Sequence, residues 1–90
     1  MMFVSLGFLK ERAEPDQQVQ RETSEFLQQP YMAIRAAGPL RDGDGRRAAM
    51  MMVFEADSRA AAEALAAQSP FLRAGLYERH EIFEYQNEVG

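Results

Sequence analysis

The chain has 90 residues and a net charge of −4, a length that fits one small domain spanning residues 1–90. It contains no cysteine, which excludes disulfides and thiolate metal sites and is compatible with a reducing cytoplasm. A single histidine and the absence of a clustered excess of Lys and Arg in the sequence disfavour a structural zinc site and nucleic-acid binding. We therefore expect a cytoplasmic domain with no cofactor and no nucleic-acid partner.

The chain begins with the apolar run MMFVSLGFL, which is rich in strand formers and predicts a first strand over residues 2–9. This run is short, lacks a preceding basic stretch and continues directly into KERAE, so we expect neither a signal peptide nor a membrane span. Pro15 suits a first helical turn, and Val19, Thr23 and Phe26 follow at helical spacing. A helix is predicted over 15–29, ending at Pro30.

Two strands joined by a polar turn are predicted in the middle of the chain. YMAIRAAG, residues 31–38, predicts a second strand that Gly38 and Pro39 stop, and the glycine-containing segment 39–46 predicts a turn. RRAAMMMVFEA predicts a third strand beginning near Arg47. Its AAMMMVF core is apolar at every position, whereas a strand with one solvated face alternates, so both faces of this strand must be covered.

Two helices from one chain shield only one face of a sheet, so we expect a homodimer joined sheet to sheet. We assign the uniformly apolar sides of the first two strands to the helices: Met2, Val4, Leu6 and Phe8, then Met32, Ile34 and Ala36. We assign the mixed sides to the partner: Phe3, Ser5, Gly7 and Leu9, then Tyr31, Ala33, Arg35 and Ala37. Such mixed sides could enclose a small-molecule pocket, where Arg35 either holds an anion or only reaches the rim.

The last third of the chain predicts a helix and a strand. Asp57 or Ser58 can cap a helix through SRAAAEALAAQ, which must end before Pro70. After a turn over 70–75, LYERHEIFEY alternates well enough to predict a fourth strand over 76–85. The resulting order is the split βαββαβ arrangement of α+β, ferredoxin-like domains with a four-stranded antiparallel sheet.

The DGDG segment, Asp42 to Gly45, has the start of a calcium loop but is better explained as a hairpin turn. Val53 stands where such a loop needs its terminal glutamate ligand. The two glycines also lack the preceding strand and following helix of a phosphate-binding loop. We therefore predict no metal site here.

Three features together resemble the YCII-related (YciI-like) domain of the dimeric α/β-barrel superfamily: AAGPL at 36–40, the alanine-rich second helix, and SPFLRAGLYERHEIFEY from Ser69. The resemblance implies a ferredoxin-like fold, a sheet-to-sheet homodimer, and an active site built from a helix-one histidine and an aspartate preceding the PF dipeptide. Arg21 matches the family's R-x-x-H motif, but Ser24 replaces its histidine and Ser69 replaces the aspartate.

The loss of this pair changes the available chemistry. An imidazole exchanges protons near neutral pH and a carboxylate orients it, whereas serine does neither unaided. Serines can still position a ligand, or act as nucleophiles beside a base. Ser69 is either an ordinary helix stop or part of a pocket. His80, on the fourth strand, is either structural or the one candidate catalytic replacement.

Two functions remain open. The first is a non-catalytic homodimer that binds a ligand or a partner, with Ser24, Arg35 and Ser69 as ligand-binding candidates. The second is a small cytoplasmic enzyme of isomerase or lyase type that acts on an aromatic or enol-like compound. The missing histidine and aspartate favour the first.

Overall fold

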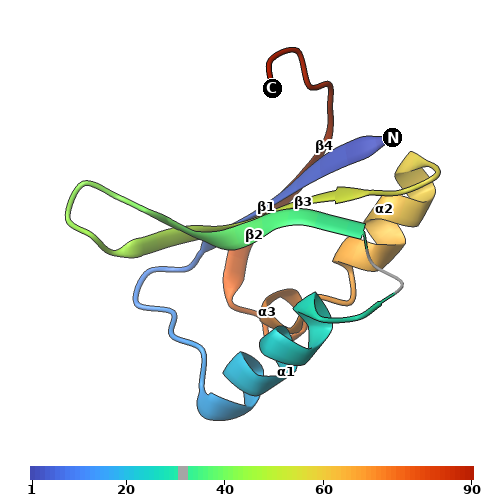
Figure 1. Ribbon diagram of the computed structural model, residues 1–90. Coiled ribbons are helices and arrows are strands. Elements are labelled where there is room, and N and C mark those ends of the chain that lie inside the picture. Colours follow the sequence, from blue (N-terminus) through green and yellow to red (C-terminus); the bar gives the residue numbers. More distant parts are fainter. Residues whose placement is uncertain (31–32) are drawn as a thin grey trace.

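The structure is a computed structural model that describes residues 1–30 and 33–90. In chain order the elements are β1 (Met2–Leu9), α1 (Gln17–Leu27), β2 (Ala33–Arg41), β3 (Arg47–Glu55), α2 (Arg59–Ala66), α3 (Pro70–Arg73) and β4 (Tyr77–Tyr85). The strands form one antiparallel sheet in the order β2-β3-β1-β4. Helices lie on one face of this sheet (Figure 1). The predicted α+β, ferredoxin-like fold class is confirmed.

Side-chain caps set the starts of the two longer helices. The Oδ1 atom of Asp16 accepts the backbone N–H of Val19 at 2.8 Å, so α1 begins two residues after Pro15. Ser58, rather than Asp57, caps α2: its Oγ accepts the N–H of Ala61 at 3.1 Å. The predicted 70–75 turn contains the short helix α3, which begins with proline at its first position.

The second strand does not stop at Gly38 and Pro39 as predicted. β2 continues to Arg41, and Pro39 lies opposite Met50 of β3. An edge strand tolerates proline because one of its sides needs no ladder hydrogen bonds. The hairpin turn is therefore shorter than expected, and the Asp42 carboxylate stabilises it by accepting two backbone N–H groups.

The side of β1 that faces the helices is the mixed one, opposite to the prediction. Phe3 is 0% exposed and packs with Phe54 of β3, their ring centroids 6.2 Å apart, in a cluster that includes Ala62 of α2. Ser5 and Gly7 alternate with Phe3 and are buried on the same side. The shapes of the side chains explain why the predicted side of β1 is wrong. The two large rings of Phe3 and Phe54 fill the layer under the helices, and the small residues Ser5 and Gly7 leave room beside them for side chains from neighbouring elements.

The predicted sides of β2 are correct at Ile34 and Arg35 and reversed at Ala36 and Ala37. Ile34 packs against the core cluster, as expected. A bulge between Ile34 and Ala36 then shifts the register against β3. Ala36 consequently turns away from the helices and Ala37 toward them. The assignments made for 31–32 lie outside the described residues.

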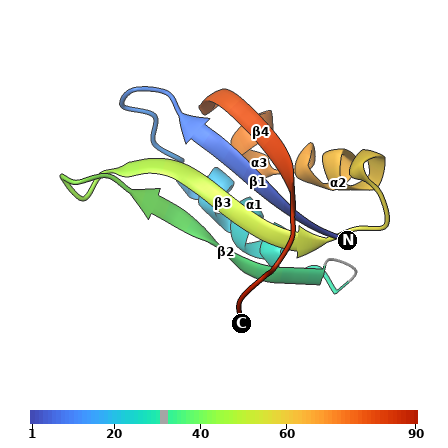
Figure 2. The same cartoon turned by 90° about the horizontal axis from the view of Figure 1, so that it is seen from above.

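The other face of the sheet carries apolar side chains and no helix from the described part of the chain. We call it the open face, and it includes Met2, Val4, Leu6, Phe8, Met51, Val53, Phe83 and Tyr85. Phe83 is 50% exposed and Tyr85 41%. Figure 2 looks down on this face, and Figure 1 shows the C-terminal tail extending away from it. None of the helices described is long and apolar enough to cross a membrane.

Gly7 provides the space that the Tyr77 ring occupies. A Cβ atom at Gly7 would clash with three atoms of this ring. The ring is fixed by stacking on Phe71, 6.0 Å between centroids, and on His80, 5.9 Å away. A register shift between Phe8 and Leu9 in the pairing with β4 accompanies this arrangement. The tyrosine therefore has little freedom to move aside.

Replacing Gly7 by alanine should lower the free energy of unfolding by roughly 1 to 3 kcal/mol, because the stacked ring must be displaced. Urea denaturation measures the change. Gly43→Ala is the matched control, since no atom lies within 4 Å of its added Cβ and its effect should be small. Equal stability of Gly7→Ala and Gly43→Ala would contradict the packing described.

Candidate functional site

A small cavity of about 40 Å³ lies between the sheet and helices α1 and α3. We call it the inner cavity. Its walls are mostly apolar and aromatic, and four side-chain hydroxyls line it: Ser5, Thr23, Ser69 and Tyr77. Apolar walls with a few polar groups are typical of a small-molecule site.

A second pocket, of about 230 Å³, adjoins the inner cavity and shares Thr23, Met50 and Phe71 with it. We call it the outer pocket. An apolar cavity of about 150 Å³ takes up benzene. The two spaces together therefore have room for a single-ring compound.

Thr23 has an unusual hydroxyl group. Its Oγ1 atom is buried and has no hydrogen-bond partner among the residues that the structure describes. A buried unpaired hydroxyl costs roughly 1 to 3 kcal/mol. Because Thr23 lines both the inner cavity and the outer pocket, a ligand placed there can supply the missing partner.

Ser69 marks the start of α3 and also lines the inner cavity. A serine at this position usually caps its helix, but the Ser69 side chain makes no capping hydrogen bond. It lies instead where it lowers the pKa of the Tyr77 hydroxyl. Burial raises the pKa of Tyr77 and outweighs the effect of Ser69. The phenol is therefore neutral near pH 7 and can both donate and accept hydrogen bonds.

Ser5 and His80 form the closest polar pair at the site. Ser5 Oγ and His80 Nε2 are 2.7 Å apart, and Ser5 is only 8% exposed. Burial lowers the pKa of His80 below its ordinary value, so the imidazole is neutral near pH 7. His80 also borders a groove of about 450 Å³ between α2 and β4, which we call the side groove. The pair thus connects two spaces.

The structure brings together only some of the residues predicted for the site. Ser69 lines the inner cavity, and His80 reaches it through Ser5. Ser24 is exposed on α1, where its Oγ accepts a hydrogen bond from Gln28 at 3.4 Å. Arg35 is also exposed and forms an ion pair with Glu55 away from the cavity.

Three of the four hydroxyl-bearing residues that line the inner cavity were not predicted as site residues: Ser5, Thr23 and Tyr77. Thr23 shares a helix face with Val19 and Phe26, and this spacing was visible in the sequence. Ser5 was recognised on the mixed side of β1, but that side was assigned to the partner. Tyr77 gave no sequence signal, because its inward direction depends on the irregular pairing near Leu9.

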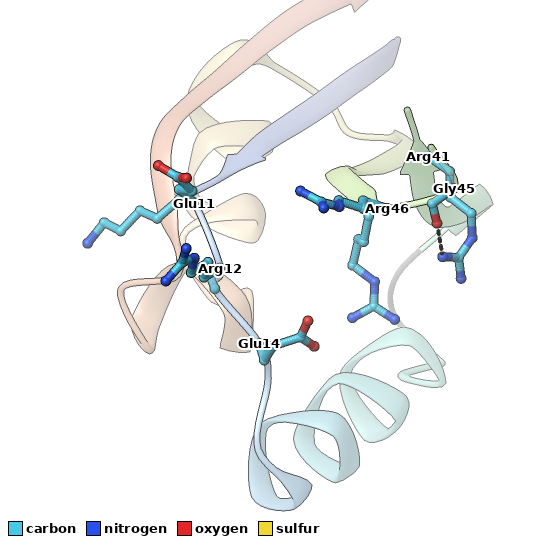
Figure 3. Close-up of a pocket in the computed structure, with 9 residues that line it drawn as sticks. Glu11, Arg12, Glu14, Arg41, Gly45 and Arg46 are labelled. Atoms are coloured by element: carbon cyan, nitrogen blue, oxygen red, sulfur yellow. Dashed lines mark hydrogen bonds between the residues drawn. The ribbon is translucent and has the colours of Figure 1, made fainter. Parts of the chain in front are cut away.

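A fourth, open cavity of about 650 Å³ lies between the loop after β1 and the β2–β3 hairpin. We call it the basic cleft. Figure 3 shows Arg12 and Glu14 on the loop side, with Arg41 and Arg46 on the hairpin side. Its cationic residues are Lys10, Arg12, Arg41, Arg46 and Arg47. The sequence showed no such cluster, because the fold assembles it from two separate segments.

The basic cleft reaches the ring-sized space described above. Arg47 and Glu14 line both the cleft and the outer pocket. The Arg47 guanidinium also lies 5.9 Å from the centroid of Phe71, a ring shared by the inner cavity and the outer pocket. Arg47, together with Glu14, therefore lies at one entrance to the outer pocket.

The sheet, the helices on one of its faces and the hydroxyl-lined cavity between them define a ferredoxin-like domain with a candidate small-molecule site. The YCII-related domain matches residues 1–86, and the chain belongs to that family. No curated protein matches the chain.

The solved structures that are similar to it include the following two. The 5-chloro-2-hydroxyhydroquinone dehydrochlorinase of Burkholderia phenoliruptrix AC1100, in complex with 2,5-dihydroxybenzoquinone, has a TM-score of 0.74 and 16% identity, covering 98% of this chain and 96% of that one. Rv0793 from Mycobacterium tuberculosis has a TM-score of 0.49 and 11% identity, covering 99% and 97%.

Replacing Thr23 by valine should raise the free energy of unfolding of the unliganded protein by about 1 kcal/mol, because a methyl group replaces a buried unpaired hydroxyl of equal shape. Chemical denaturation measures the difference. Ser24→Ala, one residue away on the exposed side of α1, should change stability by less than about 0.5 kcal/mol. A clearly destabilised Thr23→Val variant would show that the hydroxyl has a partner.

Proposed function

We propose that this YCII-related protein is a cytoplasmic homodimer that binds an anionic, hydroxylated single-ring compound in the inner cavity and outer pocket. The unpartnered Thr23 hydroxyl carries the proposal, since a ligand oxygen at that point would remove the cost of its burial. The other three hydroxyls can each donate or accept, which suits ring hydroxyl and carbonyl groups equally.

The walls of the site favour a flat ring. Phe26 and Phe71 line the inner cavity together with Met50, so an aromatic or quinonoid ring would pack against apolar and aromatic surface. The dehydrochlorinase of similar fold was solved with 2,5-dihydroxybenzoquinone, a ring compound with oxygens on its rim. That complex supports the ligand class proposed for this chain.

The basic cleft favours a negative charge on the ligand. A cleft lined mainly by one sign of charge attracts ions of the other sign and raises their local concentration. Here the attraction acts although the whole chain carries −4. Among the cations of the basic cleft, Arg47 also lines the outer pocket. It would therefore contact an acidic substituent of a ring bound there.

Binding without turnover is the role we favour for the site. We propose that the chain has lost the acid–base pair of its family, because Ser24 and Ser69 stand at those positions. General acid–base help is worth roughly 10² to 10⁴ in rate. A slow isomerase or lyase is the second candidate, and the Ser5–His80 contact is the observation that favours it.

We propose that the open face is the dimer interface. Its exposed aromatic residues, Phe83 and Tyr85, adjoin half-buried apolar side chains of β1 and β3. A contiguous apolar surface of this kind is costly to leave in water. Face-to-face packing of two sheets would cover it while leaving the cavity under each sheet to its own chain.

Adding 2,5-dihydroxybenzoquinone or 2,5-dihydroxybenzoate should raise the melting temperature of the protein, because a ligand that binds only the folded form stabilises it. Isothermal titration should show Thr23→Val weakening binding roughly tenfold, the loss of one hydrogen bond, and Arg47→Gln weakening the carboxylate compound most. Ser24→Ala is the matched control and should bind normally. Failure of both compounds to bind would refute the proposed ligand class.

Phe83→Glu should convert the dimer to a 10.2 kDa monomer, because paired carboxylates would be buried at the interface. Sedimentation velocity at micromolar concentration measures the change. Gln68→Glu adds the same charge at an exposed position beyond α2 and should leave the dimer intact. A wild-type protein that sediments as a monomer would contradict the interface.

A further inference from the structure

We propose that Ser5 and His80 act as a proton relay that takes the proton of a ligand hydroxyl and so binds the ligand as its oxyanion. The inference rests on the proposed function, because it requires a hydroxylated ligand in the inner cavity. It assigns the single histidine of the chain a chemical role that the family's missing pair does not supply.

The position of the pair between two spaces carries the proposal. Ser5 lines the inner cavity, and His80 lines the side groove on the far side of the contact. Their 2.7 Å hydrogen bond joins the two spaces. A proton leaving the cavity through Ser5 therefore reaches an imidazole that borders a groove wide enough for water to hydrate its charge.

Packing holds the two groups in register. β1 and β4 pair so that Ser5 lies opposite Ile82 and Gly7 opposite His80, which makes Ser5 and His80 diagonal neighbours. The imidazole stacks on the Tyr77 ring with an angle of 4° between planes. The Tyr77 ring fits there because Gly7 has no side chain. Gly7 therefore also determines the position of the imidazole that stacks on this ring.

The relay requires one direction for the hydrogen bond. Ser5 Oγ–H must donate to Nε2 of a neutral imidazole, whose own hydrogen then sits on Nδ1. The free lone pairs of Ser5 Oγ accept the ligand hydroxyl. When the ligand O–H bond breaks, its proton forms the new O–H bond of Ser5, and the former Ser5 proton moves to Nε2. The products are a ligand oxyanion and an imidazolium, with all protons accounted for.

The charged groups around His80 permit this step. On α2, Arg59 and Glu63 line the side groove, and they form an ion pair at 3.1 Å. On β4, Glu81 lines the groove and pairs with Arg79 at 3.4 Å. Tyr77 stacks on the ring, β1 contributes only Ser5, and α3 contributes the apolar Leu72. Each carboxylate is balanced by its arginine partner, so neither sign of charge dominates beside the imidazole. Burial lowers the pKa of His80, and the side groove gives water access to the imidazolium once it forms.

Histidine labelled with ¹⁵N gives one imidazole to follow by NMR, because the chain has only one. In the unliganded wild type at a pH where the ring is neutral, the hydrogen should reside on Nδ1. Ser5→Ala removes the donor and should shift the hydrogen to Nε2, the form that free histidine prefers. A wild-type imidazole with its hydrogen on Nε2 would overturn the relay without reference to any ligand.

The probe 4-nitrocatechol, whose phenolate absorbs visible light, tests the transfer itself. Bound to the wild type, it should ionise at least tenfold more readily than in solution, and His80 should become protonated as it does. Ser5→Ala and His80→Gln should bind the probe more weakly and, at saturating probe, lose the shift, whereas Glu78→Gln should keep it. Binding without a shift refutes the relay and leaves the ligand class standing; absence of binding refutes both.

Discussion

The contact between Phe3 and Phe54 determines which way the central strands of this domain face. Both rings are completely buried, and together they fix β1 and β3 against the helices. Side chains alternate along a strand, so the placement of Phe3 also commits Ser5 and Gly7 to the same side. A hydroxyl at one position and an absent side chain at the next are what create a polar cavity under an otherwise aromatic layer. The candidate site is therefore a consequence of core packing.

The order of the strands and helices could be predicted from hydrophobic periodicity and from proline and glycine, because both signals act locally. Which side of each strand faces the helices could not be predicted in this way. The more apolar side of β1 was predicted to face the helices. In the structure the side with Phe3 and its small neighbours faces them, because the volume and shape of these side chains fit that layer. Pro39 failed as a strand stop for a related reason, since its effect depends on whether the strand lies at an edge. These are properties of the assembled sheet and have no local signature.

The candidate site likewise has residues that the sequence indicated and residues that only the folded chain reveals. The sequence indicated Ser69 as a candidate because a helix boundary and a family motif coincide there, and the structure places it at the wall of the inner cavity. On α1 the motif pointed to Ser24, whereas the helix in this structure turns Thr23 toward the cavity, one residue away. A single-residue offset rotates a helical side chain by about 100° and exchanges exposed for buried. The basic cleft was invisible for another reason, because residues from the loop after β1 and from the hairpin meet only in three dimensions.

The two outer strands limit how copies of this protein can associate. On β2, Pro39 removes an N–H and the bulge after Ile34 distorts the edge. On β4, the carbonyl of Ile82 is already taken by Arg59 of α2, at 2.9 Å. An incoming strand would meet an incomplete row of backbone partners on either side, so sheets cannot readily grow by lateral addition. A domain with so much apolar surface on one face thus has edges that disfavour the strand-by-strand addition through which fibrils grow.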